Sequence, residues 1–171
     1  LLNEVPINQP LVYFSSDHLI ENFNIFKRAI KKNKKHLNSN NVILFAIKPT
    51  NPNTEYGYLL LDKDKKGISK VKRFIEKPKL SKARKIYKKK AYWNSGIFFI
   101  RKDSLIKNFK KYQSSTFNNC NKALIKSSYK KKIIYLKKSF FSKNSSKSFD
   151  KAILEKTNNI NAIKLNIIWT D

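Results

Sequence analysis

The clearest hydrophobic pattern in the chain is residues 91–100, AYWNSGIFFI, which hold no charged side chain. Apolar and aromatic residues in a run of this length predict a buried β-strand. Asn94, Ser95 and Gly96 interrupt the run. Two interpretations are open: a turn or bulge satisfied by backbone groups, or a strand end that opens onto a ligand with Gly96 allowing close backbone approach. In both, the Asn94 amide needs a partner, because burying it unpaired costs a few kcal/mol.

The pattern upstream predicts a strand, a helix and a second strand. Residues 11–15 form a short apolar run, and apolar residues recur at helical spacing over residues 19–30. The apolar run at 42–47 stops at Lys48. This order predicts a βαβ unit with parallel strands and a right-handed crossover. Because ligands bind beyond the carboxyl ends of such strands, we expect Asp17 and Lys48 on the same rim of the sheet.

The rest of the chain predicts a hairpin followed by helices and one more strand. The hairpin is expected from strands at 56–61 and 68–75, joined by a charged turn. Asp103 or Ser104 is expected to cap the third helix. Lysine- and serine-rich residues 130–146 are expected to form a mobile connector. The other predicted elements are helices at 80–89, 103–112, 114–128 and 148–157, and a strand at 160–165.

Length and composition narrow the class of protein. A chain of 171 residues suffices for one domain with a real core, and it holds no run of eighteen apolar residues that would predict a membrane span. No signal peptide is recognisable, and the single cysteine, Cys120, excludes an internal disulfide. We therefore expect a cytoplasmic protein without a membrane partner. The absence of methionine suggests that the sequence is a fragment.

The net charge of +27 raises the question of nucleic-acid binding. Lysine supplies 34 of the 38 basic residues, and asparagine and isoleucine are also abundant, which a nucleotide bias in the coding DNA would produce. The lysines are spread over predicted helix faces and loops, and no aromatic RNA-binding signature accompanies them. Solvated faces explain them better than a polyanion site, so a nucleic-acid partner is the less favoured hypothesis.

Charged side chains follow several predicted strands. Each of these charged residues, taken alone, is explained as a helix cap, a turn residue or a solvent-exposed residue at the end of a strand. Together they offer two carboxylates for a hard cation, lysines for phosphate oxygens and Glu76 for hydroxyl groups. The set is Asp17, Lys48, Glu76, Lys77 and Asp171.

The order of motifs resembles the mannose-1-phosphate guanylyltransferases, within the larger sugar nucleotidyltransferase family. The resemblance is carried by YFSSDHLI, FAIKPTNPNTEYGYL, VKRFIEKP, YWNSGIFFIR, SFDKAILEKT and WTD, and it runs from residue 11 to residue 171. It implies an α/β fold, a Rossmann-like α/β/α sandwich with a mixed sheet of the glycosyltransferase-A type. It also implies that residues 1–171 are a single, partial catalytic domain.

The resemblance implies a role for each matching residue. Asp17 and Asp171 would be the ligands of a Mg²⁺ ion near the nucleotide phosphates. Gly57 would line the sugar pocket through its backbone, and Glu76 would accept hydrogen bonds from mannose hydroxyls. Lys77 would bind the sugar phosphate, and Asn94 would contact the sugar. Lys48 and Asp150 also match family motifs, but no role is assigned to them.

The implied reaction joins GTP and mannose 1-phosphate to give GDP-mannose and pyrophosphate. Its nucleophile is a phosphate oxygen already ionised near pH 7, so no general base is required, and His18 is interpreted as a residue that supports the structure or the groups that bind substrate. Two departures stand out. Glu55 replaces a glycine usual before Tyr-Gly-Tyr, and the family's glycine-rich phosphate loop is absent. Without that loop, we expect the fragment to be inactive.

Three alternatives stay open. They are a nucleotidyltransferase of other sugar or base specificity, a basic nucleic-acid-binding module, and a non-catalytic relative that keeps the fold, for which Glu55 is the main argument. The sequence leaves the oligomeric state undetermined, and a homo-oligomer is compatible with it.

Overall fold

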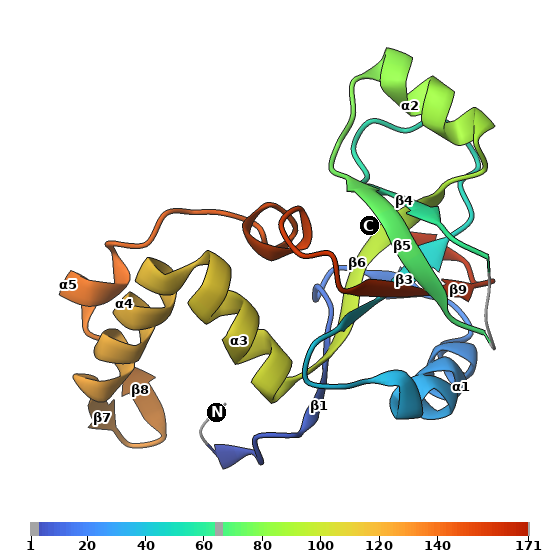
Figure 1. Ribbon diagram of the computed structural model, residues 1–171. Coiled ribbons are helices and arrows are strands. Elements are labelled where there is room, and N and C mark those ends of the chain that lie inside the picture. The colour runs from blue at the N-terminus through green and yellow to red at the C-terminus, as the bar shows by residue number, and fades with distance from the viewer. Residues whose placement is uncertain (1–3, 64–66, 171) are drawn as a thin grey trace.

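The computed structural model describes residues 4–63 and 67–170, and its centre is one mixed β-sheet (Figure 1). In this part of the chain the main sheet has six strands in the order β1-β6-β3-β9-β5-β4, and β4 also pairs with β6. The strands are β1 (Pro10–Tyr13), β3 (Val42–Ile47), β4 (Tyr58–Leu61), β5 (Ser69–Ile75), β6 (Tyr92–Arg101) and β9 (Ile160–Leu165).

The predicted parallel relationship of the first two long strands is confirmed, with one addition. β1 and β3 each pair antiparallel with β6, so they point in the same direction and β6 lies between them. The parallel neighbour of β3 is β9, from the end of the chain. The predicted hairpin is also confirmed, because β4 and β5 pair antiparallel. A mixed sheet follows, as the family resemblance implied.

Side chains cover both faces of the sheet. Along β3, Ile43 and Phe45 pack in one buried cluster, while Val42 and Leu44 pack in the other. The six residues of β3 are all buried, which explains its continuous apolar sequence. The first cluster includes residues of α1 (Phe23–Asn33) and α2 (Leu80–Lys88), and the second includes residues of α3 (Lys102–Tyr112) and of a π-helix at Asp150–Leu154.

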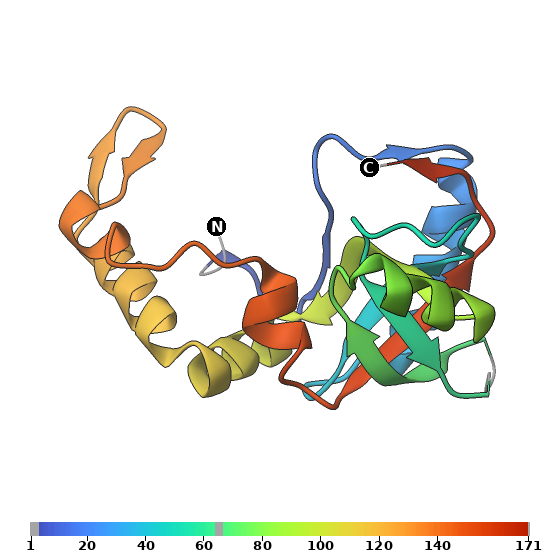
Figure 2. The same ribbon diagram turned by 90° about the horizontal axis from the view of Figure 1, so that it is seen from above.

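A second part of the chain projects away from the sheet. Helices α3 and α4 (Ser114–Ile125), a hairpin of β7 (Ser128–Lys130) and β8 (Ile133–Tyr135), and α5 (Lys138–Phe141) form this arm, and the chain then returns to the sheet through the π-helix (Figure 2). Residues 130–146, expected to form a mobile connector, include β8 and α5 in the structure, and their mobility stays a prediction. None of the helices in the described ranges is both long enough and apolar enough to cross a bilayer.

Several helices differ from the prediction at their ends. Residues 19–20 form a short strand, β2 (Leu19–Ile20), that pairs with β10 (Trp169–Thr170), so α1 begins only at Phe23. A tertiary pairing thus overrides the helical spacing of Leu19.

Helix α3 has no side-chain cap, because the Asp103 carboxylate instead binds the Arg101 guanidinium and the Ser104 N–H. The last predicted helix is a short π-helix after a helical residue at 149, and α4 ends three residues early. A short 3-10 turn (Lys34–His36) follows α1.

The interruption in β6 is a bulge inside one continuous strand. Leu44 pairs with Phe98, but Ala46 pairs with Asn94, so β6 has extra residues at this point. The Asn94 Oδ1 atom accepts a 3.4 Å hydrogen bond from the Gly96 N–H, and Ser95 Oγ accepts one of 3.3 Å from the Ile97 N–H. These bonds satisfy backbone donors that the disrupted ladder leaves unpaired. The expected bulge is therefore present, but backbone groups alone do not satisfy it, because the Asn94 Nδ2 atom donates to the Asp150 carboxylate.

Candidate active site

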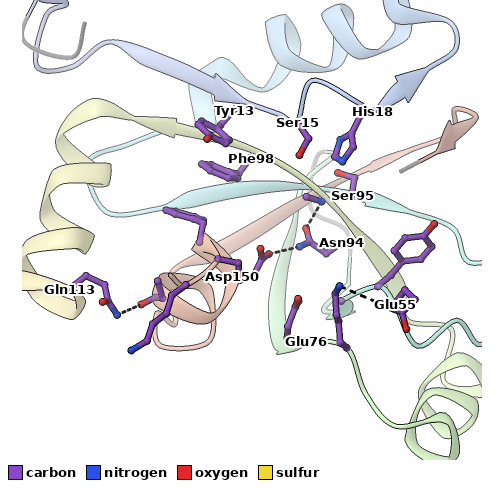
Figure 3. A pocket seen from close by; sticks show the side chains of 18 of the residues that line it. Tyr13, Ser15, His18, Glu55, Glu76, Asn94, Ser95, Phe98, Gln113 and Asp150 are labelled. Carbon is purple, nitrogen blue, oxygen red and sulfur yellow. Dashed lines mark hydrogen bonds and ion pairs between the residues drawn. The ribbon is translucent and has the colours of Figure 1, made fainter. Parts of the chain in front are cut away.

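A cavity of about 560 Å³ opens beside this bulge (Figure 3). Its walls come from β1 and the loop after it, the loop before β4, the residues directly after β5, β6, α3, the start of α4, the π-helix segment and β10. Four of the residues expected to bind sugar phosphate line it together, although they are far apart in the sequence. They are Gly57, Glu76, Lys77 and Asn94.

Asn94 is the central polar residue of the cavity wall. Its side chain is 7% exposed, and its Nδ2 atom donates a 2.8 Å hydrogen bond to Oδ1 of Asp150 (Figure 3). Its backbone N–H donates a 2.8 Å bond to the Gly57 carbonyl. The partner that the buried Asn94 amide requires is therefore the carboxylate of a residue 56 positions downstream. The same residue ties the loop before β4 to β6.

Glu76 follows the last residue of β5, and the pKa of its carboxyl group is unusually high. Burial, and then the negative charge of Asp150, raise the pKa of Glu76 to about 7, while the Lys77 ammonium opposes the shift. Burial also raises the pKa of Asp150, and its hydrogen bond from Asn94 counteracts part of that rise. Two carboxyl groups thus share one desolvated wall of the cavity.

Gly57 is adjacent to Glu76. A β-carbon built on residue 57 would lie 2.8 Å from Glu76 Oε2 and 3.2 Å from the Phe74 ring. Real β-carbons do not approach other atoms that closely, so a side chain at residue 57 would displace the Glu76 carboxyl group. Glycine at this position makes room for a second cavity residue, which the sequence did not indicate.

Lys77 holds a backbone conformation that non-glycine residues seldom adopt, with φ of 36°. Its Nζ atom lies 4.0 Å from Oε2 of Glu55, and both side chains are exposed. An ion pair this exposed and this long contributes little stability. Glu55, the departure from the family pattern, therefore contacts the lysine expected to bind phosphate.

Four aromatic rings join the walls of the cavity. Trp169 of β10 is in edge contact with both His18 and Tyr56, at ring-centroid distances of 5.5 and 5.2 Å. Tyr56 also contacts Trp93 of β6 at 4.9 Å. Gly96 has φ of 71°, and a β-carbon there would lie 3.3 Å from His18 Cε1. His18 thus packs between β6 and β10, consistent with the structural role expected for it.

Of the two predicted metal ligands, Asp17 lies within the described residues. Asp17 is exposed in the turn after β1, between Ser15 and His18. Those two residues line the cavity, and Asp17 is not among its lining residues. Asp171 lies outside the described residues. β2, which begins two residues after Asp17, pairs with β10, with Leu19 matched to Thr170. The pairing therefore brings two segments that are far apart in the sequence side by side.

The donor chemistry at Asp17 fits Mg²⁺, which takes one or two carboxylates and completes its shell with phosphate oxygens and water. Within residues 4–63 and 67–170, no three His, Cys, Asp or Glu side chains are grouped as a metal cage would require.

Sequence reasoning missed the contribution of the segment before the π-helix. The Phe149 ring stacks on Phe98 of β6 at 4.2 Å, and Phe98 stacks on Tyr13 of β1 at 4.9 Å. This column holds the segment against the sheet and places Asp150 and Lys147 in the cavity wall. The motif SFDKAILEKT was the available signal, but its spacing alone did not show which side chain faces the cavity.

Comparison with known proteins gives concordant matches. The family described as Nucleotidyl transferase matches residues 2–171. The chain is 30% identical to the mannose-1-phosphate guanylyltransferase of Escherichia coli over 99% of this chain and 37% of that protein. It is 29% identical to the alginate biosynthesis protein AlgA of Pseudomonas aeruginosa over 94% of this chain and 34% of that protein. The chain thus spans about a third of the length of these relatives.

Solved structures agree on the fold. A Helicobacter pylori structure described as mannose-6-phosphate isomerase superposes with a TM-score of 0.84 at 28% identity, covering 99% of this chain and 67% of that one. A Thermus thermophilus structure described as mannose-1-phosphate geranyltransferase superposes with a TM-score of 0.82 at 20% identity, covering 94% of this chain and 46% of that one. At the lower identity the likeness concerns the fold alone.

Proposed function

The chain belongs to the nucleotidyl transferase family, and from that premise we propose that it serves in the transfer of a guanylyl group from GTP to mannose 1-phosphate. The products are GDP-mannose and pyrophosphate. The observation that carries the proposal is the convergence of Gly57, Glu76, Lys77 and Asn94 on one cavity. These residues come from three separate motifs, and they meet at the bulge of β6.

The cavity has the polarity that a sugar phosphate requires. Glu76, Asp150 and the Asn94 amide form a wall of hydrogen-bonding groups suited to hydroxyls, which can both donate and accept. Lys77, next to Glu76 in the chain, supplies a positive charge for the phosphate. A phosphate placed against the two carboxyl groups would be repelled. The sugar would therefore lie toward Asn94 and the phosphate toward Lys77.

In the proposed reaction, an oxygen of the sugar phosphate attacks the α-phosphorus of the nucleotide, and the bond to the leaving pyrophosphate breaks. The attacking oxygen is ionised near neutral pH, so no side chain has to remove a proton. Lys77 would orient the attacking phosphate, and Glu76 and Asn94 would fix the sugar behind it. Asp17 and Asp171 would hold Mg²⁺, which when bound supplies charge neutralisation at the phosphates.

Pyrophosphate release by the full-length protein tests the proposal. The substrates are a panel of sugar 1-phosphates, each offered with GTP, ATP, UTP or dTTP in the presence of Mg²⁺. We expect the highest kcat/KM for mannose 1-phosphate with GTP. A preference for another pair would assign a different specificity within the family. No release with any pair would support a non-catalytic relative. The cytoplasmic location and a homo-oligomeric state stay predictions.

A further inference from the structure

We propose that Asp150 is a positioning residue of the sugar site, which holds the Asn94 amide for the sugar and acts on Glu76 through its negative charge. The inference rests on the proposed function and adds a residue to which the sequence assigned no role. Asp150 is a positioning residue because it acts through Asn94 and Glu76.

The first support is the hydrogen bond itself. Asn94 Nδ2 donates to Asp150 Oδ1 at 2.8 Å, while Asn94 Oδ1 accepts from the Gly96 N–H at 3.4 Å. The two bonds fix both ends of the amide plane. An amide nitrogen carries two N–H bonds, so the one not directed at Asp150 remains for a sugar oxygen. A carboxylate acceptor makes the fixed bond stronger than a neutral one would.

The second support is the way the fold holds Asp150. The Glu155 N–H donates to the Asp150 carbonyl at 2.9 Å, which is the five-residue spacing of a π-helix. Such wide turns are rare and recur at functional sites. Phe149 stacks on Phe98, and Ile153 and Leu154 are buried in the core. Asp150 is therefore anchored on both sides, as a positioning group has to be.

The third support is electrostatic. Glu76 is flanked by the carboxylates of Asp150 and Glu155 and by the ammonium groups of Lys77 and Lys151, and Asp150 has the largest effect of these charges. His18 and Lys147 line the same cavity. The negative charge of Asp150 opposes the ionisation of Glu76, so it raises the pH at which Glu76 becomes the carboxylate that accepts from sugar hydroxyls.

The test uses the full-length protein with Asp150→Asn, Asp150→Ala and the control Glu155→Gln. Glu155→Gln removes a carboxylate from the same helix without touching Asn94. For each protein, KM for mannose 1-phosphate and for GTP is measured from pH 5.5 to pH 9, and thermal melting verifies the fold.

Asp150→Ala is expected to raise KM for mannose 1-phosphate on the order of tenfold, because the Asn94 amide loses its acceptor, and to leave KM for GTP unchanged. Asp150→Asn keeps an acceptor, so at pH 8 its KM is expected within about threefold of wild type. In the plot of KM for mannose 1-phosphate against pH, the rise toward acid pH is expected to begin on the order of half a pH unit lower in Asp150→Asn, because the negative charge beside Glu76 has been removed. Glu155→Gln is expected to move this rise less and to leave KM unchanged at pH 8.

An Asp150→Asn protein with the wild-type pH profile and an Asp150→Ala protein with the wild-type KM would overturn the inference while leaving the proposed function intact. Wild-type protein that transfers no nucleotide would overturn the proposed function first, and the inference with it. If Asp150→Ala does not fold, the Asp150→Asn profile decides alone, since a purely structural role would not move it.

Discussion

The carboxyl group of Glu76 occupies the space that a β-carbon on residue 57 would need, at 2.8 Å from Oε2. Two motifs of the sequence, the Tyr-Gly-Tyr element and the Phe-Ile-Glu-Lys-Pro element, thus depend on each other through one contact. Neither motif reveals this dependence alone.

Gly57→Ala is expected to displace Glu76 and raise KM for mannose 1-phosphate at least about tenfold, with little change in KM for GTP. The cause is a β-carbon within 3.2 Å of the Phe74 ring as well, so the new methyl group has no free direction. Gly67→Ala is a control for the loss of a glycine in the hairpin turn away from the cavity. Because residue 67 has φ of 87°, this variant is expected to lose stability while its KM stays unchanged. Equal KM values for Gly57→Ala and wild type would show that the Glu76 carboxyl group has no part in sugar binding.

Glu76→Gln is expected to make the fold less sensitive to pH. The pKa of Glu76 is raised from 4.5 to about 7, so the folded state binds the proton more tightly than the unfolded state does. This raised pKa favours folding below pH 4.5, and its contribution is lost as the pH rises from 4.5 to 7. At pH 8 the variant is expected to be more stable than wild type by about 1 kcal/mol, after allowance for solvent screening.

Chemical denaturation of the two proteins at pH 5 and pH 8 measures this difference. The two free energies of unfolding are expected to differ at pH 8 and to be nearly equal at pH 5. A gap of the same size at both values would mean that the amide acts through packing and that the Glu76 carboxyl group ionises normally.

Asp17→Asn is expected to lower kcat about a thousandfold in the full-length protein without changing its melting temperature. The side chain is exposed and contributes little to packing, whereas losing a ligand of the proposed Mg²⁺ removes several kcal/mol of charge stabilisation. Asp171→Asn is expected to behave alike. Raising the Mg²⁺ concentration should restore part of the rate. Normal turnover in both variants would exclude these two carboxylates from the mechanism.

Lys77→Ala is expected to raise KM for mannose 1-phosphate by about tenfold or more, because a charge-assisted bond to phosphate is lost. Glu55→Gln is expected to have a smaller effect in the opposite direction, since it releases Lys77 from an exposed ion pair at 4.0 Å. Kinetics on the two single variants and the double variant separate the effects. A Glu55→Gln protein with a raised KM would assign Glu55 a direct role in binding.

The sequence predicted what depends on local pattern. The runs that became β3, β6 and β9 were rich in apolar residues, and the charged turn that contains Gly67 marked the hairpin of β4 and β5. The strand at Leu19–Ile20 was missed because its partner, Trp169–Thr170, lies at the other end of the chain. The bond from Asn94 to Asp150 was missed for the same reason, since a buried amide demands an acceptor without saying which.

The contact of Trp169 with both His18 and Tyr56 also bears on how the protein is made. A ribosome produces the β1 turn with Asp17 long before it produces β10, so the turn waits for residues 18–168 to be made before its neighbouring strand exists. Contacts this distant in sequence are slow to form. A nascent chain therefore lacks this wall of the cavity until Trp169 has been made, and we expect that it gains affinity for substrate only after that point.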